Sequence, residues 1–237
     1  MNAFIKQCII PVYFLVLLTF IIGGLTGHET LQLFTKPLLM PLLMLFVFIS
    51  IINSTGKNII LAALFFSFAG DVFLLFESKN SLLFIPGLVA FLLTHILYII
   101  YFFSIRPIRK SLLKTAPYLG FIVLLYGVLL LYFLFPHLGA LKVPVIIYAL
   151  IILLMLIASI HIYYRIKKTA GILFIAGAIF FIISDSLLAL NKFHTPLLFP
   201  FFIILTYGVA QYLLIRGFIK HSSSNADLGA FVDPAKA

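Results

Sequence analysis

The sequence predicts an all-α membrane protein, a polytopic bundle of eight transmembrane helices. Three observations indicate this class. Hydrophobic residues make up 64% of the 237 residues and charged residues only 9%, whereas soluble domains are about half apolar. The mean hydropathy is +1.27. The apolar residues form long unbroken runs, not the alternation over ~10 residues that is typical of membrane-spanning strands.

Eight apolar runs are long enough, at about 20 residues each, to cross the ~30 Å hydrocarbon layer of a membrane. We expect them to form one domain, residues 1–220, followed by a polar tail, residues 221–237, that is predicted to be disordered. Prolines are expected near segment ends, where a missing N–H donor is least harmful. The predicted segments are approximately 8–25, 37–54, 59–76, 82–104, 114–135, 143–163, 170–190 and 197–218, and the prolines are Pro11, Pro41, Pro86 and Pro144.

The basic residues predict the orientation of the bundle. Four of the 16 Lys and Arg residues fall on one side of the predicted membrane and the other twelve on the opposite side. Because basic residues gather on the cytoplasmic side, both termini are expected to be cytoplasmic. Topology and anionic lipid headgroups account for the net charge of +10 without a nucleic-acid partner. We expect an integral, multi-pass membrane protein, in the inner membrane if the chain is bacterial. The four outer lysines are Lys36, Lys79, Lys142 and Lys192.

Two aspartates lie in the middle of apolar runs. Asp71 occurs in FFSFAGDVFLLF and Asp185 in FFIISDSLLALN. An Asp at the centre of a membrane helix costs roughly 2.5–3.5 kcal/mol on insertion scales, so it normally faces a polar interior and serves function. The other acids lie at the ends of apolar runs or in the polar tail. Asp71 and Asp185 are therefore the main candidates for functional residues.

The two acidic segments also indicate an internal repeat. Asp71 and Asp185 are 114 residues apart. If the repeat is genuine, each half contains four helices, and an even number per half gives parallel repeats related by an axis along the membrane normal. Other matches at the same offset are Phe66 with Phe180, Gly70 with Ser184, Leu74 with Leu188, and Tyr98 with Tyr212.

The depths of the two acids agree. Asp71 lies eight residues before Lys79 and Asp185 seven before Lys192, which places both roughly 10–12 Å below the outer boundary. Matched depth on helices of one direction lets the carboxyls share a pocket, where burial and repulsion would leave one of them holding a proton. An acid/base hydrolase uses such a pair. The alternative, that hydroxyl groups pin both acids merely to lock helices together, stays open.

Further polar side chains are candidates for substrate binding around this pair. Helical spacing puts some of them on the same face as an acid, and others lie in neighbouring segments. Each has an ordinary alternative as a hydrogen-bonded packing residue. Lys36, before Pro37 at the expected outer mouth of the second segment, is a candidate for a lipid phosphate, and snorkelling is its alternative. The candidates are Lys36, Ser67, His95, Tyr98, Tyr148, Ser184, Tyr207 and Gln211.

No metal or other cofactor is expected. The six histidines are scattered, with no HxxxH spacing and no cysteine partners, although three of them, His28, His137 and His194, fall on the outer side and leave a weak site open. The one cysteine, Cys8, excludes an intrachain disulfide. No GxSxG signature of a serine nucleophile occurs.

Several motifs together resemble the YhhN family. They are TKPLLMPLL from Thr35, FSFAGDVFLL with Ser67, Gly70 and Asp71, HILY from His95, FIISDSLLALNKF with Ser184, Asp185, Asn191 and Phe193, and TYGVAQYLL with Tyr207 and Gln211. The GD and SD motifs are the most specific part, and the resemblance extends to about residue 218. It adds Asn191 to the candidate binding residues.

The resemblance implies an eight-helix membrane protein of a family that includes lysoplasmalogenase. The implied reaction is hydrolysis of the vinyl ether of a lysoplasmalogen to a fatty aldehyde and a glycerophospho-base. The implied partners are this lysophospholipid and the surrounding membrane lipids. Asp71 and Asp185 would then be the catalytic acid and base, in an order that the sequence leaves open.

Two other functions remain alternatives at this point. Two buried carboxylates in a repeated bundle also suit a proton-coupled transporter or lipid flippase. Against this, neither acidic segment contains a proline break, and no second set of acids crosses to the cytoplasmic half. The second alternative is a purely structural scaffold. The oligomeric state is unknown from the sequence.

Overall fold

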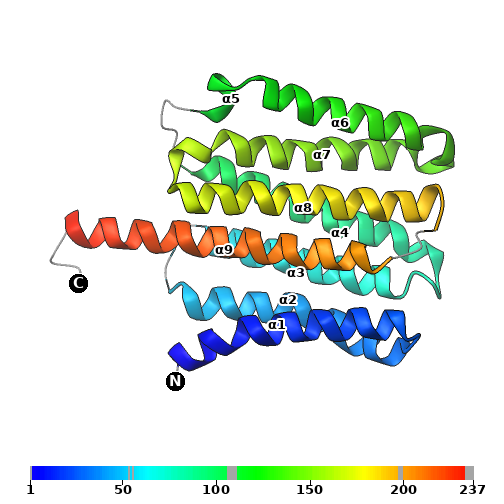
Figure 1. Cartoon of the computed structure of the whole chain (residues 1–237), viewed down its shortest axis with the longest axis horizontal. Helices are drawn as coiled ribbons and strands as arrows, with labels where there is room; N and C mark the ends of the chain where they lie inside the picture. Colours follow the sequence, from blue (N-terminus) through cyan, green and yellow to red (C-terminus); the bar gives the residue numbers. More distant parts are fainter. Residues whose placement is uncertain (1, 53, 55, 106–110, 197–199, 233–237) are drawn as a thin grey trace.

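The computed structural model of the protein describes residues 2–52, 54, 56–105, 111–196 and 200–232. Within these residues all regular secondary structure is helical. Eight of the described helical spans are long and apolar enough to cross a membrane. They lie side by side in one elongated bundle (Figure 1). The prediction of an all-α bundle with eight membrane-spanning segments is thus confirmed.

The helices begin and end within a few residues of the predicted segments in most cases. The short helix α5 and the 3₁₀ turns lie in the connections. The α-helices are α1 (Asn2–Leu25), α2 (Glu29–Ser50), α3 (Lys57–Leu75), α4 (Phe84–Ser104), α5 (Leu112–Thr115), α6 (Tyr118–Leu134), α7 (Lys142–His161), α8 (Lys168–Phe193) and α9 (Phe201–Val232).

Helix α2 begins well before its predicted segment. It begins at Glu29 and ends at Ser50, about eight residues before the start predicted at residue 37. Pro37 and Pro41 lie inside it, and Pro11 lies inside α1, so prolines are not confined to helix ends. In a membrane bundle, neighbouring helices and side chains can satisfy the backbone groups that a proline frees. As a result Lys36 lies within the helix, not at its mouth.

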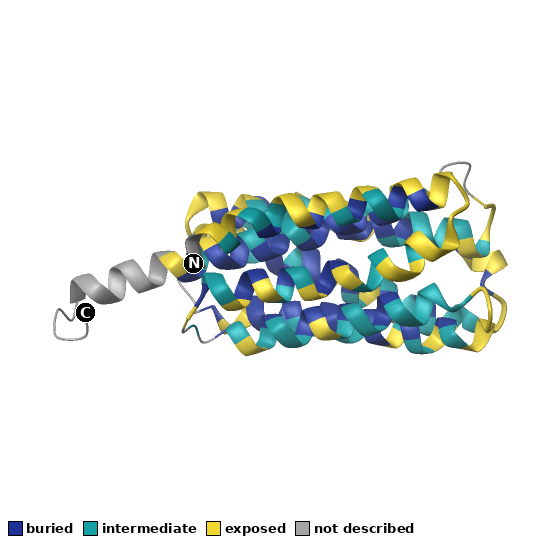
Figure 2. Ribbon diagram, turned by 90° about the horizontal axis from the view of Figure 1, so that it is seen from below, coloured by how far each residue is buried: buried dark blue, intermediate teal, exposed yellow. Residues whose placement is uncertain are grey.

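Close helix packing builds the interior. Buried residues face inward along the length of the bundle, and the exposed ones form its outer surface (Figure 2). The most extensive packing is between α8 and α9, followed by α3 with α4 and α1 with α2. Gly177 of α8 permits the closest of these approaches, since a Cβ atom there would lie 3.0 Å from the Leu214 backbone nitrogen and 3.1 Å from the Ala210 oxygen. Small residues at helix contacts are typical of membrane bundles.

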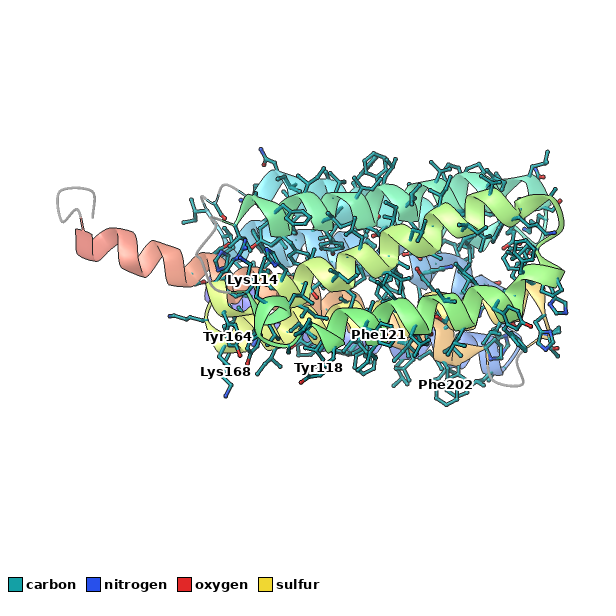
Figure 3. The ribbon with its side chains drawn as sticks, turned by 90° about the horizontal axis from the view of Figure 1, so that it is seen from above. Lys114, Tyr118, Phe121, Tyr164, Lys168 and Phe202 are labelled. Carbon is teal, nitrogen blue, oxygen red and sulfur yellow. The ribbon has the colours of Figure 1, made fainter. Side chains whose placement is uncertain are left out.

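The start of α1 and the end of the spanning part of α9 lie at the same end of the bundle (Figure 1). Lys114 and Lys168 lie at that end too (Figure 3). The membrane orientation and the internal repeat stay predictions. The predicted boundary at residue 220 falls inside α9, which continues to Val232 through much of the segment expected to be disordered; residues 233–237 lie outside the described residues.

Replacing Gly177 with alanine should destabilise the bundle. The new methyl group would press against backbone atoms of α9, which cannot move aside as a side chain can, so we expect a loss of about 1–3 kcal/mol in unfolding free energy. The measurement is thermal unfolding of the purified protein in one detergent. Gly120→Ala is the matched control, because the nearest atom to a Cβ there is Leu113 Cδ2 at 3.6 Å. Equal melting temperatures for both variants would contradict the packing described here.

Candidate active site

A cavity of about 510 Å³ opens at the end of the bundle where α1 ends and α9 begins. Residues from α1, α2, α3, α4, α8 and α9 line it. Both Asp71 of α3 and Asp185 of α8 are among these residues. The structure therefore brings the two intramembrane acids, which are 114 residues apart in the chain, to the same cavity.

Asp71 is held by side chains from two other helices. It is buried, at 2% exposure. The Tyr207 hydroxyl of α9 donates to its Oδ2 at 2.9 Å. Lys36 of α2 places its Nζ 3.9 Å from Oδ1. The Lys36 amine, for which the sequence leaves open a lipid phosphate or snorkelling to the interface, thus lies beside a carboxylate inside the bundle.

Asp185 has different partners. The Tyr148 hydroxyl of α7 donates to its Oδ2 at 2.5 Å, and Nε2 of His95 in α4 lies 3.7 Å from the same oxygen. His95 is fully buried, and within the described part of the chain neither ring nitrogen makes a hydrogen bond. The rings of Phe181 and Tyr148 enclose it, with centroids 4.5 and 5.4 Å away.

The two carboxyls are therefore chemically unequal. Each accepts one tyrosine hydroxyl, but the basic neighbour of Asp71 is an ammonium group and that of Asp185 is an imidazole. An ammonium group and an imidazole differ in charge, shape and basicity. The two carboxyls of the site therefore have unlike environments.

Six of the nine predicted binding residues are not part of the cavity lining: Ser67, His95, Tyr98, Tyr148, Asn191 and Gln211. Three of them form one hydrogen-bond network. Tyr98 donates to Gln211 Oε1 at 2.8 Å, and Gln211 Nε2 donates to Ser67 Oγ at 2.8 Å. Ser67 in turn lies 3.1 Å from the Thr94 hydroxyl. All four side chains are fully buried. This network joins α3, α4 and α9, and it fixes the helices that position Asp71, His95 and Tyr207.

The remaining candidates divide into lining and non-lining residues. Ser184 lines the cavity and donates its hydroxyl to the Ile203 carbonyl at 2.9 Å, which joins α8 to α9. Asn191 lies near the end of α8 and is not among the lining residues. Its neighbour Lys192 forms an ion pair with Glu77, which does line the cavity. This pair connects the ends of the two acid-bearing helices.

Sequence reasoning missed two polar lining residues, Gln32 and Glu77. In the sequence Glu77 lies at the end of an apolar run, so it was not considered as part of the site. Gln32 lies four residues before Lys36, so helical spacing puts both on one face of α2. That signal becomes visible only once the helix is known to begin at Glu29. Among the residues that the structure describes, no group of three or more His, Cys, Asp or Glu side chains could hold a metal ion.

The model of the YhhN family matches residues 31–218 of the chain. This range includes both aspartates, Lys36, His95, Tyr148 and Tyr207, and every helix that lines the cavity except α1. No curated protein and no solved structure matched the chain. Because the matched region covers most of the 237 residues, the chain belongs to the YhhN family.

Proposed function

We propose that the protein is a membrane-embedded hydrolase of the lysoplasmalogenase type, which cleaves the vinyl ether of 1-alkenyl lysophospholipids. Membership of the YhhN family is consistent with such a protein. The observation that carries the proposal is the placement of two unequal carboxyls, Asp71 and Asp185, in one cavity within an apolar bundle. Such a cavity suits a substrate that is itself partly a hydrocarbon.

The proposed reaction has three steps: protonation of the vinyl ether, capture of the resulting cation by water, and collapse of the hemiacetal. Protonation of the outer vinyl carbon gives an oxocarbenium ion, which water attacks to form a hemiacetal. The hemiacetal then breaks its bond to the glycerol oxygen, and this oxygen takes up a proton. The products are a fatty aldehyde and a glycerophospho-base, and one water molecule is consumed. The reaction needs an acid, and it needs an anion beside the developing positive charge.

The Asp185–His95 pair is the proposed acid. The imidazole and the carboxyl lie 3.7 Å apart, so one proton can reside on either group with the same net charge for the pair. The Tyr148 hydroxyl holds the carboxyl in place at 2.5 Å. After the proton has passed to the vinyl carbon, the pair can take up the proton that the attacking water releases as the hemiacetal forms.

Asp71 is the proposed anion. The nearby Lys36 ammonium and the Tyr207 hydroxyl both stabilise a negative carboxylate. A fixed anion beside the cavity lowers the energy of the oxocarbenium ion and orients the water that captures it. Ser184 and Glu77 add polar groups to the same lining, and no cofactor takes part in the proposed mechanism.

The packing of the opposite end favours a hydrolase over a transporter. Aromatic rings of α4, α8 and α9 fill the interior there: Phe174 packs 5.1 Å from Phe102 and 5.9 Å from Tyr101, and Phe218 lies 5.4 Å from Tyr101. Alternating access requires a route to both sides of the membrane, whereas a hydrolase needs one mouth.

We further propose that both termini are cytoplasmic and that the chain is a parallel repeat of four helices. Residues 57–75 of α3, shifted by 114 positions, fall within α8, and residues 87–104 of α4 fall within α9. With this orientation the cavity opens in the outer half of the membrane. The sequence-derived excess of basic residues at the other side supports it.

Substituting either catalytic aspartate should abolish aldehyde release. Asp71→Asn removes the anion and Asp185→Asn the acid, and each should lower kcat by about 100-fold or more. The assay measures aldehyde from a 1-alkenyl lysophospholipid with detergent-purified protein and no gradient. Glu29→Gln, which removes an acid outside the cavity lining, should keep full activity. Turnover by both Asn variants at the wild-type rate would rule out the proposed mechanism.

Lys36→Met should separate two roles for this lysine. As the counter-ion of Asp71 it acts on the reacting centre, so its loss should lower kcat by about tenfold or more with little change in KM. A lysine that binds the lipid phosphate would instead show a raised KM at unchanged kcat. The measurement is steady-state kinetics of aldehyde release. Lys79→Met, which removes a cation from the same end of the bundle, is the control and should leave both constants unchanged.

A further inference from the structure

An apolar groove runs along the outside of the bundle between α6 and α8. Its volume is about 460 Å³, comparable to that of the polar cavity. Helix α7 forms part of its lining through Leu153, Leu156 and Ile160. With the exception of Tyr126, all lining residues are aliphatic. The proposed mechanism uses none of these residues.

The groove exists because α6 is loosely attached. Only 17% of the most apolar window of this span is buried, the lowest value among the described spans. Gly127 brings α6 against Leu153 of α7 at one point. Many of its large side chains are exposed on the outside of the bundle, including Tyr118 and Phe121 at 62% and 67% exposure (Figure 3). The side of α6 that faces α8 therefore leaves space for an apolar ligand.

A small space of about 50 Å³, here called the passage, lies between this groove and Asp185. The passage shares Tyr126, Leu153 and Ile182 with the groove. At its other end it shares Asp185 with the polar cavity. Shared wall residues thus place the groove, the passage and the carboxyl that the proposed mechanism uses as its acid next to one another.

One hydrogen bond stands across the passage. The hydroxyls of Tyr126 and Ser186 lie 2.7 Å apart. Ser186 donates its own proton to the Ile182 carbonyl at 2.7 Å, so the tyrosine is the donor of the pair. Tyr126 is 41% exposed, and nothing but this bond fixes its hydroxyl among the contacts of the described residues. Single hydrogen bonds between membrane helices are weak on average, so a side chain held in this way can turn aside at small cost.

The direction of the groove fits a lipid whose head lies in the polar cavity. From Ser186 the groove follows α8 through Ile183 and Ile179 to Ile175. This stretch of α8 is about 16 Å long and leads away from the end where the polar cavity opens. A single hydrocarbon chain attached to a group at Asp185 would follow that direction into the depth of the membrane.

We propose that the groove between α6 and α8 is the binding site for the hydrocarbon chain of a lysophospholipid, and that this chain passes Tyr126 to present its head to Asp185. The inference rests on the proposed function, since it names the chain subsite of the same active site. A lysolipid, which has one chain, suits a passage of about 50 Å³ better than a bilayer lipid with two chains does.

The first experiment measures chain binding without turnover. The probe is a lysophosphatidylcholine with a long acyl chain that carries a diazirine at its end, added to full-length protein in dioleoylphosphatidylcholine nanodiscs. After illumination, mass spectrometry should place the label on residues 119–126 and 175–183. Excess unlabelled lysophosphatidylcholine should displace it, although the bilayer lipid is present throughout.

Two substitutions on one face of α8 provide a matched pair. Ile179 lines the groove and is 43% exposed, whereas Ile172 lies seven residues earlier, is 49% exposed and does not line it. Ile179→Trp should fill the groove and reduce the label there by about tenfold, within the range for steric changes in apolar pockets. Ile172→Trp should leave the label unchanged. Both variants should elute and melt like the wild type.

Three outcomes would overturn the inference. The label could spread evenly over all lipid-facing helices, or Ile179→Trp could match Ile172→Trp; either result would make the groove an ordinary lipid contact. Crosslinking of a second copy of the chain through α6 would make this face a protein interface. These readouts need no catalysis, so an enzyme that releases no aldehyde but shows the expected label contradicts the proposed function alone.

The second experiment uses aldehyde release to test the same groove. Ile179→Trp should lower kcat/KM for a long-chain 1-alkenyl lysophospholipid by about tenfold and leave that for a short-chain substrate unchanged, because a short chain does not reach Ile179. The control Ile172→Trp should preserve the ratio of the two. An equal loss for both substrates would show that the substitution disturbs the reacting centre and not a chain subsite.

Discussion

The constraint on which the rest of the structure depends is the burial of two acids in an apolar bundle. A carboxyl taken out of water needs hydrogen-bond donors and a group that balances its charge. Asp71 has Lys36 of α2 and Tyr207 of α9 beside it, and Asp185 has His95 of α4 and Tyr148 of α7. The acids themselves lie on α3 and α8. Six helices are therefore held in a fixed relation by the need to satisfy two side chains.

Much of this arrangement could be predicted because it depends on short stretches of sequence. A run of 20 apolar residues indicates a spanning helix wherever it occurs, and a lone acid inside such a run marks a functional position. Counting residues from Lys79 and Lys192 placed Asp71 and Asp185 at equal depth, and the structure has both lining one cavity. Their membership of one site followed from depth and direction, which need no knowledge of packing.

The side chains that contact the two acids were harder to predict from the sequence. The helices are apolar nearly all round, so no amphipathic face shows which side of each helix turns inward. Lys36 was placed at the membrane surface because Pro37 resembles a helix boundary, yet α2 continues through two prolines and directs the amine at Asp71. The bond between Tyr126 and Ser186 likewise joins residues of different helices whose rotation only the folded bundle fixes.

The unequal lengths of α6 and α8 have a consequence for the membrane in which the protein resides. Helix α6 has 17 residues and α8 has 26, which correspond to about 26 and 39 Å. The 3₁₀ turn Phe135–His137 extends α6 to a span of 20 residues, close to the ~30 Å thickness of a typical hydrocarbon layer, whereas α8 exceeds this thickness. A helix longer than the layer tilts or thickens the bilayer around it. The two helices that border the groove therefore match the membrane differently, and a change of bilayer thickness acts on α8 more than on α6.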